Sequence, residues 1–411
     1  MSSNEKYTGA KSPQPSLRED NNHAFRIESR NITPTDVSQF LRLDGCERYL
    51  FLRLHQKENG DSFLYDYDVA PQAITPLLTA AGLDFEREVE EAAAEAFVSV
   101  KCTRPDEEDA EDSAEGLTDN ALVAERARLL GNGETLLLFQ PRIAARLGIW
   151  LVVGDVDVLR LHRDEAGHLH ILIVDIKGTA QVKTEHRLQV AFYAEMITAV
   201  LAQAAVPVAA LDIGILYQGP ADGGEVSGLP PLREAAQRRL ATRYLGVDGA
   251  LLEVVGNMQN YTAEVRDLLI GDEAEIVQLA AKPFSEVPYR LGLKCDGCLF
   301  NEFCLKDSHE RGDLSAIPYI TDAHKRSLQL EGVRTVSEVA ALMQFADDEN
   351  GSNEDAGKDT LTPAQQHKAL VRRLLSGNIG SHLEELVLRA RRVNTARTKS
   401  SEPLENAEAA E

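Results

Sequence analysis

Several patterns that would assign a function directly are missing from this chain of 411 residues. There is no Gly-x-x-x-x-Gly-Lys-Ser/Thr loop, which excludes a P-loop motor, and no Gly-x-Ser-x-Gly turn typical of serine hydrolases. The ten histidines show no His-x-x-x-His spacing that would bind a metal. Because neither a long apolar run nor a secretory signal is present, we expect a cytoplasmic protein without a membrane span.

Positive charge is also scarce, since 43 Lys and Arg face 66 Asp and Glu, for a net charge of −23. Such a balance disfavours nucleic acid as a partner, because phosphate contacts need basic side chains. The acidic excess gathers, however, at 106–115, 347–359 and the C-terminal tail. Basic clusters remain at 177–187, 282–294 and 372–399, each of which is also compatible with a solvated patch.

Hydrophobic alternation predicts one strand over residues 149–161 and a second over 169–177. The polar stretch 163–167 between them contains a glycine and predicts a hairpin loop. If these strands pair, Asp157 and Asp175 lie side by side at neighbouring strand ends.

The residues at these strand ends suit metal chemistry. Carboxylates such as Asp157 and Asp175 are ligands for Mg²⁺ or Mn²⁺, which lower the pKa of bound water and stabilise charge on a phosphate. Lys177 would orient the attacking water or neutralise the oxyanion. The alternative is that the three residues form an ordinary ion pair at the strand ends.

Two predicted helices add candidates to this group. Residues 186–204 carry an apolar stripe and place Gln189 and Tyr193 four residues apart on one side, where both can donate to phosphate. Residues 83–97 have a buried edge beside which Glu86 could reach the metal. An amphipathic helix without a special role is the alternative for each.

The motifs Gly82-x-x-x-Glu86, Gly154-x-x-Asp157, Asp175-Ile-Lys177 and Gln189-x-x-x-Tyr193 occur in this order. Together they resemble the RecB-like branch of the PD-(D/E)XK nuclease superfamily, over residues 30–345. The resemblance implies metal binding by Glu86, Asp157 and Asp175, with Lys177 catalytic. Gln189 and Tyr193 would orient the lysine or the nucleic acid. Position 86 is often histidine in this branch.

The cysteines are few, and three of them form Cys295-x-x-Cys298-x5-Cys304. The close first pair favours a metal over a disulfide. With Cys46 as a distant fourth ligand, the set could bind zinc or a [4Fe–4S] cluster, and one pair with two outliers is unusual for zinc. Cys102 is expected to be a lone thiol.

One cysteine before the nuclease motifs and three after them resembles the iron-staple nucleases of the AddB and CRISPR-associated RecB-like types. This resemblance implies a [4Fe–4S] cluster held by Cys46, Cys295, Cys298 and Cys304, with zinc as the alternative. After the cysteines, residues 322–330 and 335–343 predict a helix-hairpin-helix-like pair, which could bind phosphate backbone or be purely structural.

The expected fold is an α/β restriction-endonuclease-like core, with a central mixed sheet flanked by helices and with helical additions. Boundaries are expected as a disordered tail (1–30), nuclease domain (31–310), helix-hairpin-helix-like segment (311–345), acidic linker (346–360), C-terminal helical segment (361–395) and acidic tail (396–411).

The expected function is metal-dependent phosphodiester hydrolysis, as an exonuclease on single-stranded DNA or DNA ends in repair, recombination or defence. A separately encoded helicase would supply any strand separation. The alternatives are a catalytically inactive nucleic-acid-binding adaptor and an iron–sulfur sensor that retain the fold.

Overall fold

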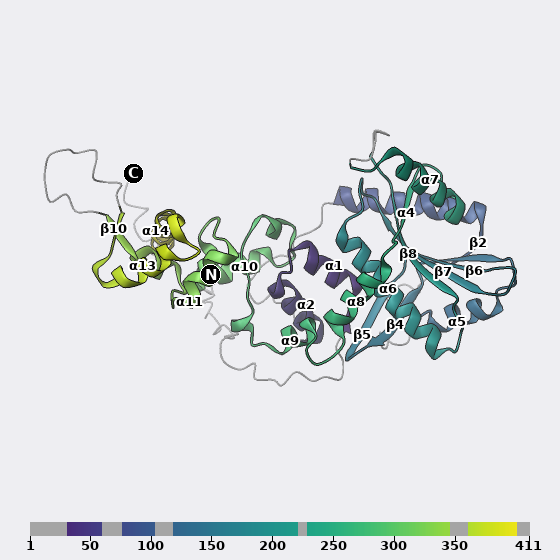
Figure 1. Cartoon of the computed structure of the whole chain (residues 1–411), viewed down its shortest axis with the longest axis horizontal. Coiled ribbons are helices and arrows are strands. Elements are labelled where there is room, and N and C mark those ends of the chain that lie inside the picture. The colour runs from purple at the N-terminus through teal and green to yellow at the C-terminus, as the bar shows by residue number, and fades with distance from the viewer. Residues whose placement is uncertain (1–30, 60–75, 103–117, 221–227, 346–360, 401–411) are drawn as a thin grey trace, which may run out of the picture.

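The computed structural model describes residues 31–59, 76–102, 118–220, 228–345 and 361–400. Within these ranges the chain forms a larger α/β region and a smaller, mostly helical C-terminal region, arranged along the long axis of the molecule (Figure 1). The predicted N-terminal tail 1–30, the acidic stretches 106–115 and 346–360, and residues 401–411 lie outside the described residues. No described helix is long and apolar enough to cross a membrane.

A six-stranded sheet with both parallel and antiparallel pairs forms the centre of the larger region, which confirms the expected mixed sheet. The predicted strand over 169–177 is confirmed as the central strand β7, and its hairpin partner is β6. In spatial order the strands are β2 (Val98–Lys101), β3 (Thr135–Phe139), β6 (Val158–Arg163), β7 (Leu169–Lys177), β8 (Ala210–Tyr217) and β9 (Leu251–Val254).

The prediction of one continuous strand over 149–161 is wrong. The segment divides into β5 (Trp150–Asp155) and β6, which belong to different sheets. β5 pairs with β1 (Asn31–Ile32) and β4 (Arg142–Leu147) in a smaller sheet.

The break has a physical cause on the partner strand. β3 with β6 and β4 with β5 share one antiparallel register, with Phe139 opposite Val158 and Arg142 opposite Asp155. Between them lies Pro141, which has no N–H for the ladder, preceded by Gln140 at φ +53°. One long hairpin therefore bends between the two sheets, and Asp157 lies at the bend.

The two faces of the six-stranded sheet are covered by different helices. α6 (Thr184–Gln203) packs on one face, where Ile171 and Ile173 of β7 point. α4 (Pro76–Ala96) and α7 (Pro231–Leu245) share a core with Leu172 and Val174 on the other face (Figure 1).

The remaining helices of the larger region complete its core. They are α1 (Pro34–Arg42), α2 (Glu47–Asn59), α5 (Asn120–Leu129), α8 (Met258–Leu269), α9 (Glu275–Ala281) and α10 (Asn301–Arg311). The predicted helices over 83–97 and 186–204 are present as α4 and α6, each beginning earlier than expected.

The C-terminal region has one hydrophobic core of its own, which joins segments predicted to be separate. The helix predicted over 322–330 is confirmed, and Thr335 caps the next helix in a capping box with Glu338. The last helix continues to Ser400, so the tail predicted from 396 begins too early. The elements are α11 (Asp322–Leu330), α12 (Val336–Ala341), β10 (Met343–Phe345), β11 (Leu361–Pro363), α13 (Lys368–Ser376) and α14 (Leu383–Ser400).

Gly154, in β5, allows α6 to approach the bent hairpin. A Cβ at this position would lie 2.8 Å from Cε1 of Tyr193 and 3.1 Å from Cδ of Pro34. We predict that Gly154→Ala lowers the free energy of unfolding by about 1–3 kcal/mol through overpacking. Urea denaturation measures it, with Gly256→Ala as control, since a Cβ there meets nothing within 4 Å. Equal stability of the two variants would contradict this packing.

Candidate active site

Asp157 and Asp175 are brought together by the pairing of β6 with β7. Val158 is opposite Val174, so Asp157, one residue before β6, continues the register opposite Asp175. The Oδ2 atom of Asp157 accepts a hydrogen bond of 2.6 Å from the Ile176 backbone N–H. Asp175 is 2% exposed and Asp157 is partly buried, so both carboxylates are largely shielded from water at the strand ends.

Lys177 is the cation beside this pair. Its Nζ lies 2.9 Å from Oδ1 and 2.8 Å from Oδ2 of Asp175. Apart from this ion pair, Oδ2 has no hydrogen bond among the described residues, so it can accept a further partner. Burial disfavours the charged lysine, but Asp175 and then Asp157 raise its pKa above the ordinary value.

Asp157 carries the largest electrostatic cost of the group. Burial, followed by the charge of Asp175, raises the pKa of Asp157 well above its ordinary value of 3.8. Lys177 and the Ile176 N–H lower it only in part. When both carboxylates are ionised, the single ammonium of Lys177 leaves an excess of negative charge, which a divalent cation would balance.

The donor set fits a hard cation that keeps part of its water. No group of three or more His, Cys, Asp or Glu side chains is preassembled for a metal in the part of the chain that the structure describes. Mg²⁺ is commonly bound by only one or two carboxylates plus water, and the open Oδ2 of Asp175 with Asp157 meets that requirement.

Glu86 reaches the same group from α4, on the opposite face of the sheet. Burial raises its pKa, Lys177 lowers it, and Asp175 raises it again, so its carboxyl lies within electrostatic range of both. The loop after β7 runs close to this helix, since a Cβ on Gly178 would lie 3.5 Å from Cα of Gly82. Glu86 is thus placed near the pair, while its role as a ligand stays a prediction.

Gln189 and Tyr193 lie deeper than their polarity suggests. The sequence predicts that both present donors to phosphate, yet they are 9% and 4% exposed. They share a side-chain hydrogen bond, and burial, then Asp175 and Asp157, raise the pKa of Tyr193 well above its ordinary value. Their position behind the aspartates, with the ring against Gly154, supports the site from within.

His186 is a neighbour of the site that sequence reasoning missed. It is buried in the first turn of α6, and its pKa is lowered by burial and then by Lys177. Its Nδ1 accepts from the Lys183 backbone N–H at 3.3 Å, which leaves Nε2 to carry the proton of the neutral ring. The signal was its spacing, since His186, Gln189 and Tyr193 follow the i, i+3, i+7 pattern of one helix face.

Four cysteines from three segments lie within electrostatic range of one another outside this site, although they do not form a group of three or more ligands close enough to hold a metal within the described ranges. The pKa of Cys46 is raised by burial and then by Cys295, whereas burial raises Cys298 to a pKa of about 11 and Cys304 to about 12. The charges of Cys46, Cys298 and Cys295 also raise the pKa of Cys304. Cys102 lies apart, and burial, then Asp119, raises its pKa to about 11.

Backbone N–H groups point at three of these sulfurs. Cys46 accepts from Tyr49 and Arg48, Cys298 from Phe300, and Cys295 Sγ from Gly292 at 3.4 Å. Such donors favour a thiolate over a neutral thiol.

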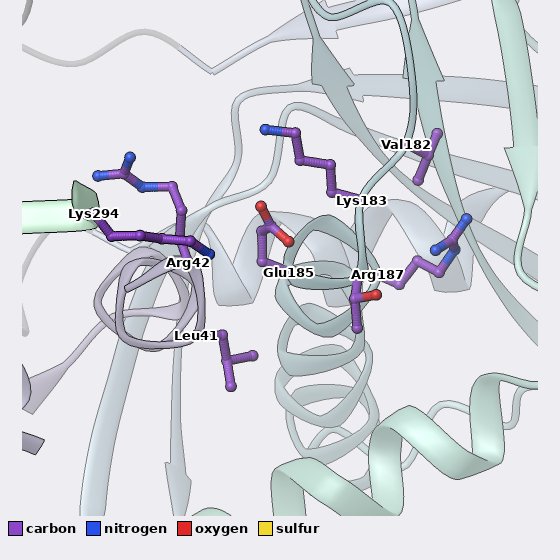
Figure 2. Close-up of a pocket in the computed structure, with 8 residues that line it drawn as sticks. Leu41, Arg42, Val182, Lys183, Glu185, Arg187 and Lys294 are labelled. Atoms are coloured by element: carbon purple, nitrogen blue, oxygen red, sulfur yellow. The ribbon is translucent and has the colours of Figure 1, made fainter. Parts of the chain in front are cut away.

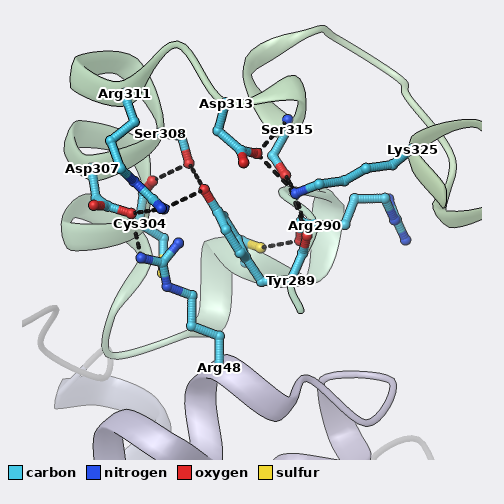
Figure 3. A network of polar contacts seen from close by, with 11 residues as sticks. Arg48, Tyr289, Arg290, Cys304, Asp307, Ser308, Arg311, Asp313, Ser315 and Lys325 are labelled. Carbon is cyan, nitrogen blue, oxygen red and sulfur yellow. Dashed lines mark hydrogen bonds and ion pairs between the residues drawn. The ribbon is translucent and has the colours of Figure 1, made fainter. Parts of the chain in front are cut away.

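Arg48 supplies positive charge beside the cysteines (Figure 3). It is 1% exposed, forms an ion pair with Asp307, and lies 3.8 Å above the Tyr289 ring. Its Nε and Nη1 have no hydrogen-bond partner among the described residues. Since an unpaired buried donor is costly, an anionic group beside Cys304 would satisfy it.

The chain is similar to one protein family in sequence and, weakly, to two solved structures. A sequence profile of the PD-(D/E)XK nuclease superfamily matches residues 69–305. A crystal structure of SSO0001 is similar at 14% identity, 67% coverage of this chain, 86% coverage of that chain and a TM-score of 0.27. One of the Legionella pneumophila effector RavZ has 11% identity, 66% coverage of each chain and a TM-score of 0.15. No curated protein sequence matches the chain.

The electrostatics of Asp157 give a stability prediction. Its folded pKa is raised, so the native state keeps a proton that the unfolded chain loses above pH 3.8. From that pH up to the raised pKa, the free energy of unfolding of the metal-free protein should fall as pH rises. Asp157→Asn stays neutral and still accepts from Ile176, and should melt a few degrees higher than the unchanged protein at neutral pH.

Thermal melting with and without Mg²⁺ or Mn²⁺ separates the effect of the Asp157 charge on stability from the role of Asp157 as a metal ligand. The metal should raise the melting temperature of the unchanged protein and of Asp212→Asn, an exposed control in β8, but not of Asp157→Asn. An equal metal-induced shift in all three would mean that Asp157 is not a ligand.

Proposed function

Because the chain belongs to the PD-(D/E)XK nuclease superfamily, we propose that it hydrolyses phosphodiester bonds of single-stranded DNA or DNA ends as a Mg²⁺- or Mn²⁺-dependent, RecB-like exonuclease. The observation that carries the proposal is the convergence of Asp157, Asp175 and Lys177. The three form one cluster of charges, in which Lys177 is ion-paired with Asp175, and Glu86 lies within electrostatic range of both members of that pair.

Each residue has a distinct task in this proposal. Asp157 and Asp175 would hold the metal, which supplies a water of lowered pKa and stabilises charge on the phosphate. Lys177 would place its ammonium beside the developing oxyanion, and Asp175 keeps it charged and oriented through their ion pair. Gln189 and Tyr193 fix the packing of α6 against the bent hairpin behind the aspartates.

We further propose that Cys46, Cys295, Cys298 and Cys304 hold a [4Fe–4S] cluster, with zinc as the alternative. The mutual influence of the four thiols, the backbone donors to their sulfurs and the unsatisfied Arg48 support an anionic thiolate centre. Such a centre would join α2, near the beginning of the fold, to α10. The centre would close the long loop between Cys46 and Cys295, and closing so long a loop restricts the unfolded chain strongly.

Cleavage depends, in this proposal, on the charge of Lys177. We predict that Lys177→Ala and Asp175→Ala each lower the cleavage rate on the order of a hundredfold or more, because transition-state charge loses its counter-charge or its metal. End-labelled single-stranded DNA with Mg²⁺ or Mn²⁺ gives the rates. Lys101→Ala, which removes a lysine paired with Glu90 at the sheet edge, is the matched control and should cut normally.

Unimpaired cutting by Lys177→Ala would overturn this mechanism. Loss of cutting together with loss of the folded state, seen by thermal melting, would assign Lys177 a structural role instead.

The cysteine centre is tested by its metal content. In protein purified without oxygen, we predict iron and acid-labile sulfide, both lost in Cys46→Ser and Cys298→Ser together with thermal stability. Cys102→Ser should keep both, because that thiol lies outside the group. Stoichiometric zinc without iron would replace the cluster but keep the four ligands, whereas a metal-free protein of unchanged stability would remove the centre altogether.

A further inference from the structure

A polar cavity lies next to the catalytic group, between the C-terminal end of α1 and the loop that enters α6. Its volume is about 610 Å³. Figure 2 shows Arg42 and Lys294 on one side of this space and Lys183 and Arg187 on the other, with Glu185 between them in this view.

The cavity gathers positive charge in a strongly acidic protein. Its lining contains four cations and one carboxylate, whereas the chain as a whole has a net charge of −23. The cations come from three separate segments, namely α1, the 182–187 stretch and the segment that leads into Cys295. Because α6 begins at Thr184, the positive end of a helix of 20 residues adds to the same field.

Internal contacts hold the cations in place without neutralising all of them. Arg187 forms a bidentate ion pair with Glu253, in which Nε donates to Oε1 at 2.6 Å and Nη2 to Oε2 at 3.1 Å. Lys294 forms an exposed pair with Asp44, which contributes little in water. Among the described residues, Arg42 donates to the neutral oxygens of Gln39 and Gly297, the latter at 2.6 Å, and Lys183 has no ion pair.

A short stretch of chain links the cavity to the catalytic group, and His186 lies within electrostatic range of both. The loop 178–183 follows Lys177 directly and ends at the cavity. The pKa of His186 is lowered by burial, then by Lys177 of the catalytic group, and also by Lys183 of the cavity. The imidazole thus feels charges of both the catalytic group and the cavity, which the loop 178–183 joins, so a chain of phosphates could extend from one to the other.

We propose that this cavity binds the phosphate backbone of the substrate strand beside the scissile bond, with Lys183, Lys294 and Arg42 as the phosphate-binding residues. This inference rests on the proposed nuclease function and goes further by assigning the path of the strand. A polyanion is repelled by the acidic surface, so a local concentration of cations beside the aspartates decides where it can approach.

The position of the cavity also ties strand binding to the cysteine segment. Lys294 immediately precedes Cys295, and Arg42 is anchored to Gly297 between Cys295 and Cys298. One wall of the cavity is therefore built from the cysteine segment, which connects the two functional regions.

The test measures binding rather than cleavage. In the non-cleaving Asp157→Asn protein, Lys183→Gln with Lys294→Gln should weaken binding of labelled oligothymidylate on the order of tenfold at physiological salt. The slope of log affinity against log salt should fall by about 0.7 for each phosphate that is no longer neutralised. Lys101→Gln with Arg239→Gln removes the same charge from β2 and α7 and should bind like the parent. Lys183→Arg with Lys294→Arg should restore binding.

The outcomes separate the strand path from the proposed function. Equal affinity and salt slope in the cavity and control variants would overturn the inference, as would competition by free inorganic phosphate at concentrations matched to the strand phosphates. If the unchanged protein cuts DNA but the cavity variants bind it normally, only the strand path is wrong. If the unchanged protein neither cuts nor binds single strands, the proposed function fails as well. Matching melting temperatures would show that the variants are folded.

Discussion

The antiparallel register between β6 and β7 is the constraint on which the site depends. It sets Val158 opposite Val174. Because Asp157 precedes Val158 and Asp175 follows Val174, the same register puts Asp157 opposite Asp175. The bend at Pro141 ends β6 at this level, so the two carboxylates meet where the pairing of β6 with β7 stops, while β7 continues to pair with β8. The backbone N–H of Ile176 then turns toward the Asp157 side chain. The geometry of the site follows from strand pairing, not from its loops.

This placement is electrostatically unfavourable in the absence of a ligand. Asp157 and Asp175 are desolvated and repel each other, and Lys177 compensates only one of them. A core built for stability alone would exclude such a pair, and strained electrostatics of this kind are typical of functional sites. Helix α6 tolerates the arrangement because Tyr193 packs against Gly154 and hydrogen-bonds Gln189 in the layer behind it.

A second polar network connects the cysteine region with the C-terminal region. The Tyr289 ring receives Arg48 from α2 at 3.8 Å and Lys325 from α11 at 4.2 Å. Lys325, although 6% exposed, donates to Asp313, Ser315 and the Tyr289 carbonyl oxygen (Figure 3). Charges buried with this many partners fix one arrangement of the segments that carry them. The position of Arg48 beside Cys304 therefore depends on contacts from both regions.

Local patterns in the chain were enough to predict most elements and the residues that the fold brings together at the candidate site. Alternation predicted β7 to the residue, and the cap at Thr335 and the helix over 322–330 were local signals that packing did not override. Asp157, Asp175 and Lys177 were identified because their residue types and spacing are typical of a metal-dependent site.

The arrangement of these elements in space, by contrast, was decided by the tertiary structure. The break after β5 is caused by Pro141 on a partner strand, which periodicity within 149–161 cannot register. Three features arise only where α6 meets α1 and the bent hairpin: the burial of Gln189 and Tyr193, the position of His186 near Lys177, and the cation-lined cavity. The sequence pattern could not predict them, because burial and electrostatic potential depend on neighbours that are distant in sequence.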